Sequence, residues 1–433
     1  MHAQVEAAEL YERALAAARE LDAADPDDIS AVHEALGEVR YKLGEFDRAA
    51  AALRKAKSLA RDDLRRARIC YQLSLVADRA GRLPVALGWL TRARRVITAR
   101  ADPDAERLLA ECAAQYGLIR HWQGRDPAAV GVLNEAVALA ESAGADDALA
   151  TALVWLDNCE MTLGLSASGH HAERALAIWR RFGNRPWEEA RVLNQLGIRA
   201  YFEGRWDVAV DLYGQSKDAC DRAGDRFTAA VESGNMAEVL SDQGHYPEAQ
   251  ELLRDALQVW RAAAAPSFVA FGKSQLGRLA ARCGRFEEAF DLLRSARADY
   301  VADGEAAEVL ESDARIAECQ LLQGDFRSAL ATADAALGTA STIGSLLPQV
   351  PLLQRVRGLA LAATGRTDDA LVVLDGSMGS ARARTARHEV AWTLQAIEHV
   401  RLTAGLPPSP EVTAERTALF DQLGIVAVPI FPA

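Results

Sequence analysis

Apolar residues recur along this chain with the spacing of amphipathic helices, and the segment 187–224 shows the pattern clearly. They lie at helical spacing on both sides of a glycine at position 204, namely Val192, Leu196, Ile198, Ala200, Ala209, Leu212, Tyr213 and Ala219. Residues at this spacing share one face of an α-helix. The pattern therefore predicts two helices that meet in a short turn and pack against each other as a hairpin.

The same hairpin recurs at an interval of about 40 residues. Its turn carries a glycine at ten positions: Gly44, Gly81, Gly124, Gly164, Gly204, Gly244, Gly284, Gly324, Gly365 and Gly405. In most units an alanine follows five residues later, and in five units a second glycine precedes by seven, at 37, 117, 197, 277 and 358. Small residues at these positions let paired helices approach closely. A further glycine at 224, 304 and 344 fits a left-handed helix cap. A period of this length predicts an all-α stack of hairpins.

Several of these units resemble the tetratricopeptide repeat family. The residues that carry the resemblance are Leu-Gly at 196–197 and 276–277 and the turns GRW at 204–206, GHY at 244–246, GRF at 284–286 and GDF at 324–326. The resemblance implies a right-handed superhelical solenoid of antiparallel hairpins. The family's usual repeat has 34 residues. The longer units and the tail LGIVAVP at 423–429 resemble the C-terminal arm of bacterial STAND-type signalling ATPases, some of which carry an adenylate or guanylate cyclase domain.

The repeats divide the chain into three predicted parts. Residues 1–22 read as an unpaired second helix, from a truncated or capping repeat, and we expect the chain to be cut from a longer one. Residues 23–404 form an array of about nine hairpins, with an irregularity or small hinge at 163–172 and a proline-containing link at 345–351. Residues 405–433 form a capping helix and an apolar tail, which we expect to pack on the final hairpin.

Composition narrows the class of partner. Lysine and arginine number 49 against 61 aspartate and glutamate, a formal charge of −12, which disfavours a nucleic-acid partner. No run approaches 18 apolar residues and no signal-peptide pattern opens the chain, so we expect no membrane contact. The six cysteines are at least 36 residues apart, which excludes a CxxC pair and fits reduced thiols in the cytoplasm.

Three short motifs carry possible chemistry, and each has a simpler explanation. The triplet Gly272-Lys273-Ser274 lacks the upstream glycine and strand of a phosphate-binding loop. His388-Glu389 could begin a zinc-binding HExxH, but Trp392 occupies the second histidine position, so we interpret it as a solvated helix face. His170-His171 near Cys159 matches no established metal spacing. We therefore predict no metal, no cofactor and no catalytic residue.

The concave face of the stack is the expected binding surface. In stacked hairpins the first helices line this face, and their register places on it Arg191, Asn194, Tyr201, Glu238, Ser274, Arg278, Arg282 and Arg355. Arginine can hold a carboxylate through two hydrogen bonds, and aromatic side chains add contact area. An acidic protein or peptide segment is therefore the expected partner, although Tyr201 could equally pack between layers and single arginines could be solvated.

These features favour a non-catalytic interaction scaffold, in which the concave groove binds a partner segment or other domains of a longer parent chain. By resemblance it would be the regulatory or sensor module of a signalling or transcription-regulating system. An intracellular receptor for a small molecule or peptide signal, using the same groove, is the alternative. Part of a nucleotide cyclase or NTPase is a third, disfavoured because no phosphate loop or paired metal-binding aspartates occur in the sequence.

Overall fold

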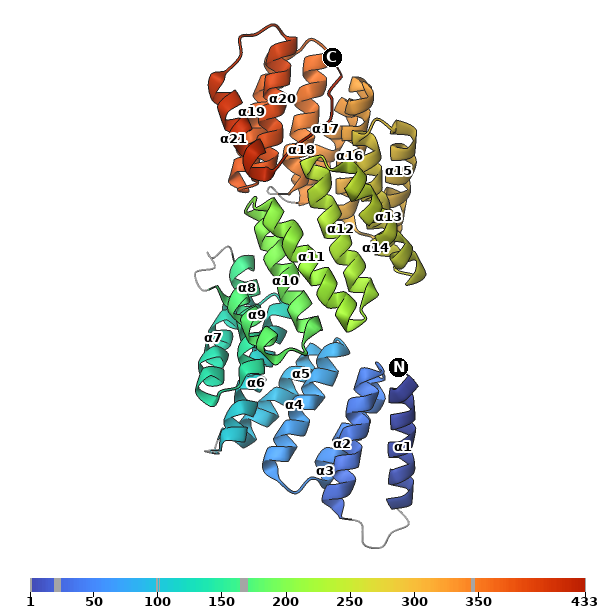
Figure 1. Cartoon of the computed structure of the whole chain (residues 1–433), viewed down its shortest axis with the longest axis vertical. Helices are drawn as coiled ribbons and strands as arrows, with labels where there is room; N and C mark the ends of the chain where they lie inside the picture. The colour runs from blue at the N-terminus through green and yellow to red at the C-terminus, as the bar shows by residue number, and fades with distance from the viewer. Residues whose placement is uncertain are drawn as a thin grey trace. The chain divides into compact units, whose positions relative to one another are not determined.

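The computed structural model describes residues 2–18, 25–98, 100, 102–163, 170–343 and 347–432. These residues form 21 α-helices and no β-strand (Figure 1). The predicted all-α solenoid of antiparallel hairpins is confirmed. The chain divides into two compact units, Met1–Asn184 (unit 1) and Arg185–Ala433 (unit 2). The division after Asn184 was not predicted, and the boundaries at 22 and 404 remain a prediction.

Unit 1 contains the first nine helices of the described chain. They are α1 (His2–Ala18), α2 (Pro26–Lys42), α3 (Phe46–Leu59), α4 (Asp63–Arg79), α5 (Leu83–Ile97), α6 (Pro103–Trp122), α7 (Asp126–Ala143), α8 (Asp146–Thr162) and α9 (His171–Phe182). Helices α2 and α3, α4 and α5, and α6 and α7 pack as hairpins, while α1 packs on α2. First helices of successive hairpins, such as α6 and α8, also touch. The hairpins therefore stack.

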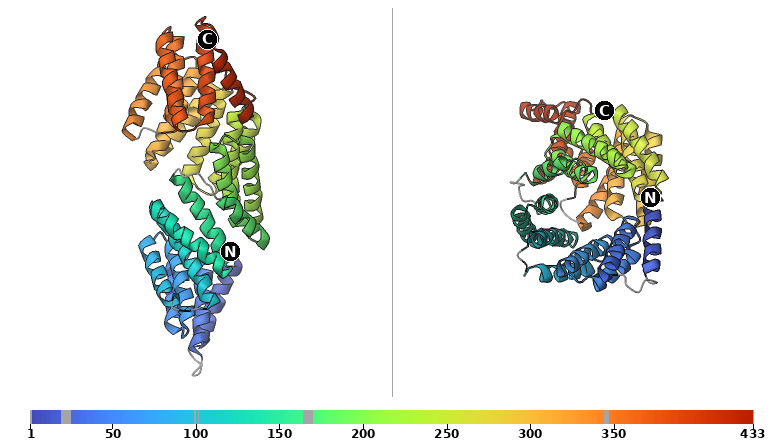
Figure 2. Two further views of the ribbon diagram at one scale, coloured as in Figure 1. Left: turned by 90° about the vertical axis from the view of Figure 1, so that its left-hand side faces the viewer. Right: turned by 60° about the horizontal axis from the view of Figure 1, so that its bottom comes forward.

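Unit 2 continues the pattern of stacked hairpins. Its helices are α10 (Pro186–Phe202), α11 (Trp206–Ala223), α12 (Arg226–Gln243), α13 (Tyr246–Ala262), α14 (Pro266–Arg282), α15 (Phe286–Asp303), α16 (Ala306–Gln323), α17 (Phe326–Ile343), α18 (Gln349–Ala363), α19 (Thr367–Ala383), α20 (Arg387–Thr403) and α21 (Pro410–Leu423). Figure 2 shows paired helices side by side within each unit.

The turn glycines adopt the backbone conformation that the repeat requires. Nine of the ten have a positive φ, for example +72° at Gly204, whereas Gly164 lies outside the described residues. The predicted caps Gly224 and Gly304 are left-handed as well, and Gly344 also lies outside the described residues. Of the predicted irregularity at 163–172, residues 164–169 are outside the described chain, as are 345 and 346 of the link. Local turn chemistry therefore sets where most helices stop.

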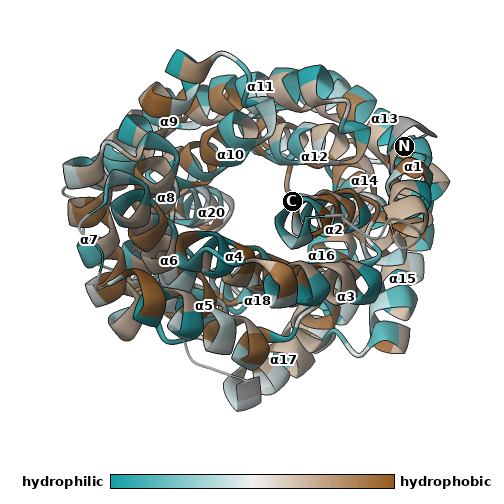
Figure 3. Cartoon of the chain, turned by 90° about the horizontal axis from the view of Figure 1, so that it is seen from below, coloured by the Kyte–Doolittle hydropathy of each residue, from teal (hydrophilic) through white to brown (hydrophobic). Residues whose placement is uncertain are grey.

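The small residues of the repeat lie where the paired helices meet. Each alanine that follows a described turn glycine by five residues is fully buried, at positions 49, 86, 129, 209, 249, 289, 329 and 370. A Cβ atom added to Gly277 would lie 2.7 Å from Leu293 Cγ, and one added to Gly197 would lie 2.6 Å from Tyr213 Cε1. Both distances are shorter than any real Cβ contact, so only glycine fits. The helices carry hydrophilic and hydrophobic residues on different faces (Figure 3).

The apolar tail after α21 reaches further than the final hairpin. Gln243 at the end of α12 donates its side-chain amide to the Leu423 carbonyl at 3.0 Å, and its own carbonyl accepts from the Val426 backbone N–H at 2.8 Å. Gly244 lies so close to the tail that an added Cβ would be 2.6 Å from the Ala427 carbonyl oxygen. Phe431 packs beside His399, with ring centroids 5.4 Å apart. The tail therefore joins the turn after α12 to α20 within unit 2.

Candidate functional site

Polar side chains on the first helices of unit 2 meet in a buried ionic cluster, which we define as Asp242, Arg278, Arg282, Glu318, Arg355, His388 and Glu389. Asp242 Oδ1 lies 2.8 Å from both Arg282 Nη1 and Arg278 Nη2. Glu318 lies 3.8 Å from Arg282 and 3.9 Å from Arg278. Arg282 also donates to the Ser241 carbonyl at 3.0 Å. Helices α12, α14 and α16 are thus cross-linked by charge.

The second half of the ionic cluster comes from α18 and α20. Arg355 forms an ion pair with Glu389. The Trp392 ring lies beneath both halves, 4.9 Å from the Arg282 guanidinium carbon and 6.0 Å from that of Arg355. His388 lies 3.7 Å from the Glu389 carboxylate. Cation–π contacts are strongest away from water, and these groups are buried or nearly so.

The arginines of the cluster favour the ionised forms of Asp242 and Glu389 in spite of burial. Burial alone would raise the pKa of Asp242, but the guanidinium groups of Arg278 and Arg282 outweigh it and lower that pKa to about 2. Burial likewise opposes ionisation of Glu389, and Arg355 reverses the effect, so the pKa of Glu389 is below its ordinary value. Burial lowers the pKa of His388, which favours the neutral imidazole. Opposite charges a few ångströms apart thus lower the two carboxyl pKa values, whereas burial lowers that of the imidazole.

The expectation that arginines of the concave face are free to hold an acidic partner is therefore wrong for three of them. Arg278, Arg282 and Arg355 point at acidic residues of neighbouring hairpins, so their charges are already neutralised. The interpretation of His388-Glu389 as a solvated helix face is wrong for the same reason, because both side chains are largely buried inside the cluster. Whether any of these residues contacts a partner stays a prediction.

The other predicted surface residues are also engaged. Asn194 donates to both oxygens of Glu232 at 2.8 Å. The Tyr201 ring stacks on Trp206 at 5.9 Å between centroids, with an interplanar angle of 7°. The remaining three have partners or strong burial: the Arg191 guanidinium lies over Trp187, Ser274 accepts from Arg315, and burial raises the pKa of Glu238.

Glu232 makes unit 2 sensitive to pH. Burial raises the pKa of Glu232 to about 7, even though hydrogen bonds from Asn194 and other neighbours lower it. The unfolded carboxyl titrates near 4.5, so between about pH 4.5 and 7 the folded state binds more protons than the unfolded state. The free energy of unfolding therefore falls as the pH rises through this range, and the loss persists above pH 7.

We expect Glu232→Gln to raise the melting temperature at pH 8 and to change it little at pH 4. The neutral amide keeps an acceptor for Asn194 and removes the buried charge, a gain on the order of 2 kcal/mol at pH 8. Thermal unfolding at both pH values measures it, with the exposed Glu251→Gln as matched control. Equal effects of Glu232→Gln at both pH values would contradict this explanation.

An aromatic pocket of about 330 Å³ opens between helices α12 to α16 of unit 2. It is lined by Val231, Asn235, Trp260, Ser267, Phe268, Phe271, Tyr300, Glu305 and Glu308. Trp260 is fully buried, and its indole N–H has no acceptor among the residues that the structure describes. The sequence analysis did not identify Trp260 and Tyr300. These two lie sixteen residues after the turn glycines Gly244 and Gly284, so the repeat register could have identified them.

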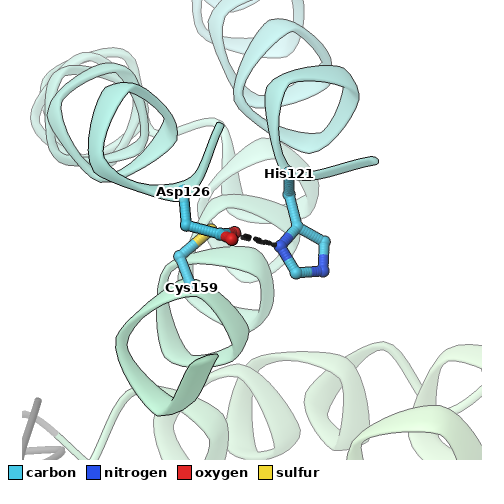
Figure 4. Close-up of side chains that lie close together, drawn as sticks. All are labelled: His121, Asp126 and Cys159. Carbon is cyan, nitrogen blue, oxygen red and sulfur yellow. Dashed lines mark hydrogen bonds and ion pairs between the residues drawn. The ribbon is translucent and has the colours of Figure 1, made fainter. Parts of the chain in front are cut away.

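Unit 1 brings a histidine, an aspartate and a cysteine together (Figure 4). His121 Nδ1 and Asp126 Oδ1 are 2.6 Å apart, and Cys159 Sγ lies 3.6 Å from the same nitrogen. All three ligand atoms lie within 4.8 Å of one another. Burial, reinforced by Asp126, raises the pKa of the Cys159 thiol to about 12. The sequence analysis considered Cys159 only beside His170-His171 and rejected that set as a metal site; His171 lies 3.7 Å from Glu160.

The triplet Gly272-Lys273-Ser274, which lacks the upstream glycine of a phosphate-binding loop, lies within α14 as expected. Lys273 Nζ is 2.6 Å from Asp299 and 3.0 Å from Ser295 Oγ, so the ammonium group forms an ion pair and a hydrogen bond with α15. Among the described helices, none has the length and apolar character to cross a membrane.

Comparison with known proteins identifies the repeat. Models of the tetratricopeptide repeat match residues 32–67 in unit 1 and 234–266 in unit 2. Curated protein sequences give no significant match. Among solved structures, a STAND protein (Signal Transduction ATPase with Numerous Domains) with a tetratricopeptide repeat sensor, from Pyrococcus horikoshii, is 14% identical with a TM-score of 0.54. The match covers 67% of this chain and 44% of that protein, so this chain spans less than half of its length.

Two further solved structures are less similar. Apo RapI is 13% identical with a TM-score of 0.46, and the match covers 63% of this chain and 99% of RapI. A Rap protein complexed with competence and sporulation factor is also 13% identical, with a TM-score of 0.45 and coverage of 92% and 97%. At such identities a likeness concerns the fold alone. A matched repeat in each unit, surrounded by hairpins of the same build, shows that this chain contains tetratricopeptide repeats.

Proposed function

We propose that this chain is a regulatory or sensor module that binds a partner segment on the inner face of unit 2, with the aromatic pocket as the anchoring point. Tetratricopeptide repeats make the chain a protein-interaction scaffold. The P. horikoshii protein carries such repeats as its sensor, and we extend that role to this chain. The proposal includes a cytoplasmic location and no catalysis by the chain itself.

The aromatic pocket is the observation that carries the proposal. Aromatic side chains in a partly enclosed site give much contact area for little conformational entropy, and they dominate binding hot spots. Here Trp260, Phe268, Phe271 and Tyr300 come from three successive helices, α13, α14 and α15. We expect the buried indole N–H of Trp260, which lacks an acceptor among the described residues, to donate to a carbonyl group of the partner. An unmade buried hydrogen bond costs free energy, which an incoming acceptor would recover.

The charge around the pocket changes the expected partner. The acidic partner predicted from the sequence depended on arginines that are paired inside the ionic cluster. The pocket instead carries Glu305 and Glu308 at its edge. A segment with one apolar or aromatic anchor beside a lysine or arginine therefore complements it better.

The ionic cluster contributes by fixing the first helices before a partner arrives. Asp242, Arg282, Arg355 and Glu389 hold helices from four hairpins, α12, α14, α18 and α20, in one arrangement. A surface that needs no reordering loses less entropy on binding. The same rigidity would transmit a conformational change caused by partner binding along unit 2, because each hairpin packs against the next.

Selection from a random peptide library displayed on phage tests this function. We expect the purified chain to enrich peptides with one aromatic or large apolar residue next to a basic residue. Ser267→Trp, which fills the pocket mouth, should lose these peptides, whereas Ser341→Trp, an exposed helical serine outside the pocket, should keep them. Equal binding by Ser267→Trp and wild type would overturn the assignment of the pocket.

A small-molecule receptor is the second candidate, and the pocket volume favours it. A volume of about 330 Å³ falls at the lower end of the range of small-ligand sites. Thermal-shift screening with metabolite-sized ligands distinguishes a small-molecule receptor from a peptide-binding module. A stabilising small ligand that Ser267→Trp abolishes, together with no enriched peptide, would favour the receptor.

A further inference from the structure

We propose that His121, Asp126 and Cys159 of unit 1 bind a zinc ion. These residues come from the last turn of α6, the first turn of α7 and the last turn of α8, so three helices contribute one ligand each. Figure 4 shows their ligand atoms pointing toward one another. Imidazole nitrogen, carboxylate oxygen and thiolate sulfur are the three ligand types that zinc uses in proteins.

The repeat architecture explains why the three side chains converge. His121 and Asp126 flank the turn glycine Gly124 of one hairpin, and Cys159 lies on the first helix of the next. The first helices α6 and α8 touch, which brings Cys159 beside the turn. Because the backbone on all three sides is helical or tightly turned, the ligands are held by rigid elements and not by a loop.

The distances suit a tetrahedral ion. Zinc bonds of about 2.0–2.1 Å to nitrogen and 2.3 Å to sulfur place these two atoms roughly 3.6 Å apart in a tetrahedron. His121 Nδ1 and Cys159 Sγ are 3.6 Å apart. The carboxylate oxygen of Asp126 is 2.6 Å from the nitrogen, so it must move outward by somewhat over half an ångström. A rotation of the Asp126 side chain is enough for this.

The surroundings favour a metal over a simple hydrogen-bonded trio. Cys159 is fully buried, and Asp126 is nearly so. The rings of Trp122 and Trp155 each lie 5.5 Å from the His121 ring and shield it from solvent. Water competes weakly for an ion in such a place. The fourth position would be filled by a water molecule, since three protein ligands leave one open.

Binding exchanges one proton for the ion. The Cys159 thiol loses its proton to solvent as the sulfur–zinc bond forms, and the proton on His121 Nδ1 moves to Nε2 through solvent. The site then carries a thiolate and a carboxylate opposite Zn²⁺, which gives no net charge. Thiolate and imidazole ligands disfavour Mg²⁺ and Ca²⁺, which prefer oxygen. The proposal replaces the sequence-based expectation of no metal.

Titration of the full chain with Co²⁺ and Zn²⁺, after removal of bound metal with a chelator, tests the site. We expect a thiolate-to-cobalt charge-transfer absorption that saturates at one ion per chain and disappears when Zn²⁺ is added. Cys159→Ser should abolish this absorption, and Asp126→Asn should weaken Zn²⁺ binding by roughly 100-fold. Cys112→Ser, at a fully buried cysteine on α6 outside the trio, is the matched control and should bind as wild type does.

Two outcomes would overturn the proposal. One is a wild-type chain that shows no charge-transfer band at high micromolar Co²⁺. The other is unchanged binding by both Cys159→Ser and Asp126→Asn. Circular dichroism of each metal-free variant checks that it folds, and His121→Gln provides a third, independent ligand variant if Cys159→Ser unfolds.

Discussion

Arg282→Met should destabilise unit 2 by about 3–5 kcal/mol, the largest effect expected for any single substitution considered in this chain. The Arg282 guanidinium is almost fully buried, and it pairs with Asp242 while lying near Glu318. Removing it leaves two buried carboxylates with one arginine, Arg278, between them. Water cannot reach them to compensate, so the cost of their desolvation is no longer offset.

Denaturant unfolding followed by tryptophan fluorescence measures this loss, because Trp392 lies directly against Arg282. Arg285→Met, three residues further on, is the matched control. Arg285 is exposed and pairs with Glu288 at 2.8 Å, so its loss should cost less than about 1 kcal/mol. If the two variants unfold at the same denaturant concentration, the ionic cluster does not stabilise unit 2 as we describe.

Gly277→Val should destabilise unit 2 by about 3 kcal/mol. The added Cβ would lie 2.7 Å from Leu293 Cγ and 3.2 Å from the Ala289 backbone carbonyl oxygen, so α14 and α15 must move apart. Overpacking of this kind forces side chains off their rotamers and shifts the backbone. Leu293 is fully buried, so its side chain has little room to move.

Gly338→Val separates this steric effect from the general cost of changing a helical glycine. Gly338 lies within α17, and a Cβ added there meets no atom within 4 Å. We expect its stability to stay within about 0.5 kcal/mol of wild type, since valine and glycine differ little in helix propensity. Similar losses in both variants, measured by urea unfolding, would show that close approach at Gly277 is not what requires glycine.

The helices could be predicted because each one is encoded locally. Turn glycines such as Gly204 and Gly244 have the expected positive φ, and the alanine five residues later is buried in every described unit that carries it. Helix formation, turn conformation and the contact between two neighbouring helices depend on residues within one repeat of about 40. The sequence of each repeat therefore contains the information that these features require.

The ionic cluster shows where reading the sequence failed. Glu238, Arg278 and Glu318 are spaced by 40 residues, as are Asp242 and Arg282, so each occupies the same place in successive hairpins. Alternating charge at the repeat period signals ion pairs between stacked hairpins, and we took the arginines as a free basic surface. The sequence placed these arginines on the correct face of their helices, but it did not identify the acidic residues of the neighbouring hairpins that pair with them.

The sequence by itself determined the all-α repeat, its period, its turns and the small residues between paired helices, because these follow from contacts within a single hairpin. Only the tertiary structure decided which polar groups lose water. Gln243 meets Leu423 across 180 residues of chain, and Cys159 meets His121 across 38. Burial and pairing at such separations depend on how successive hairpins stack and where the tail returns, and no local pattern of residues specifies either.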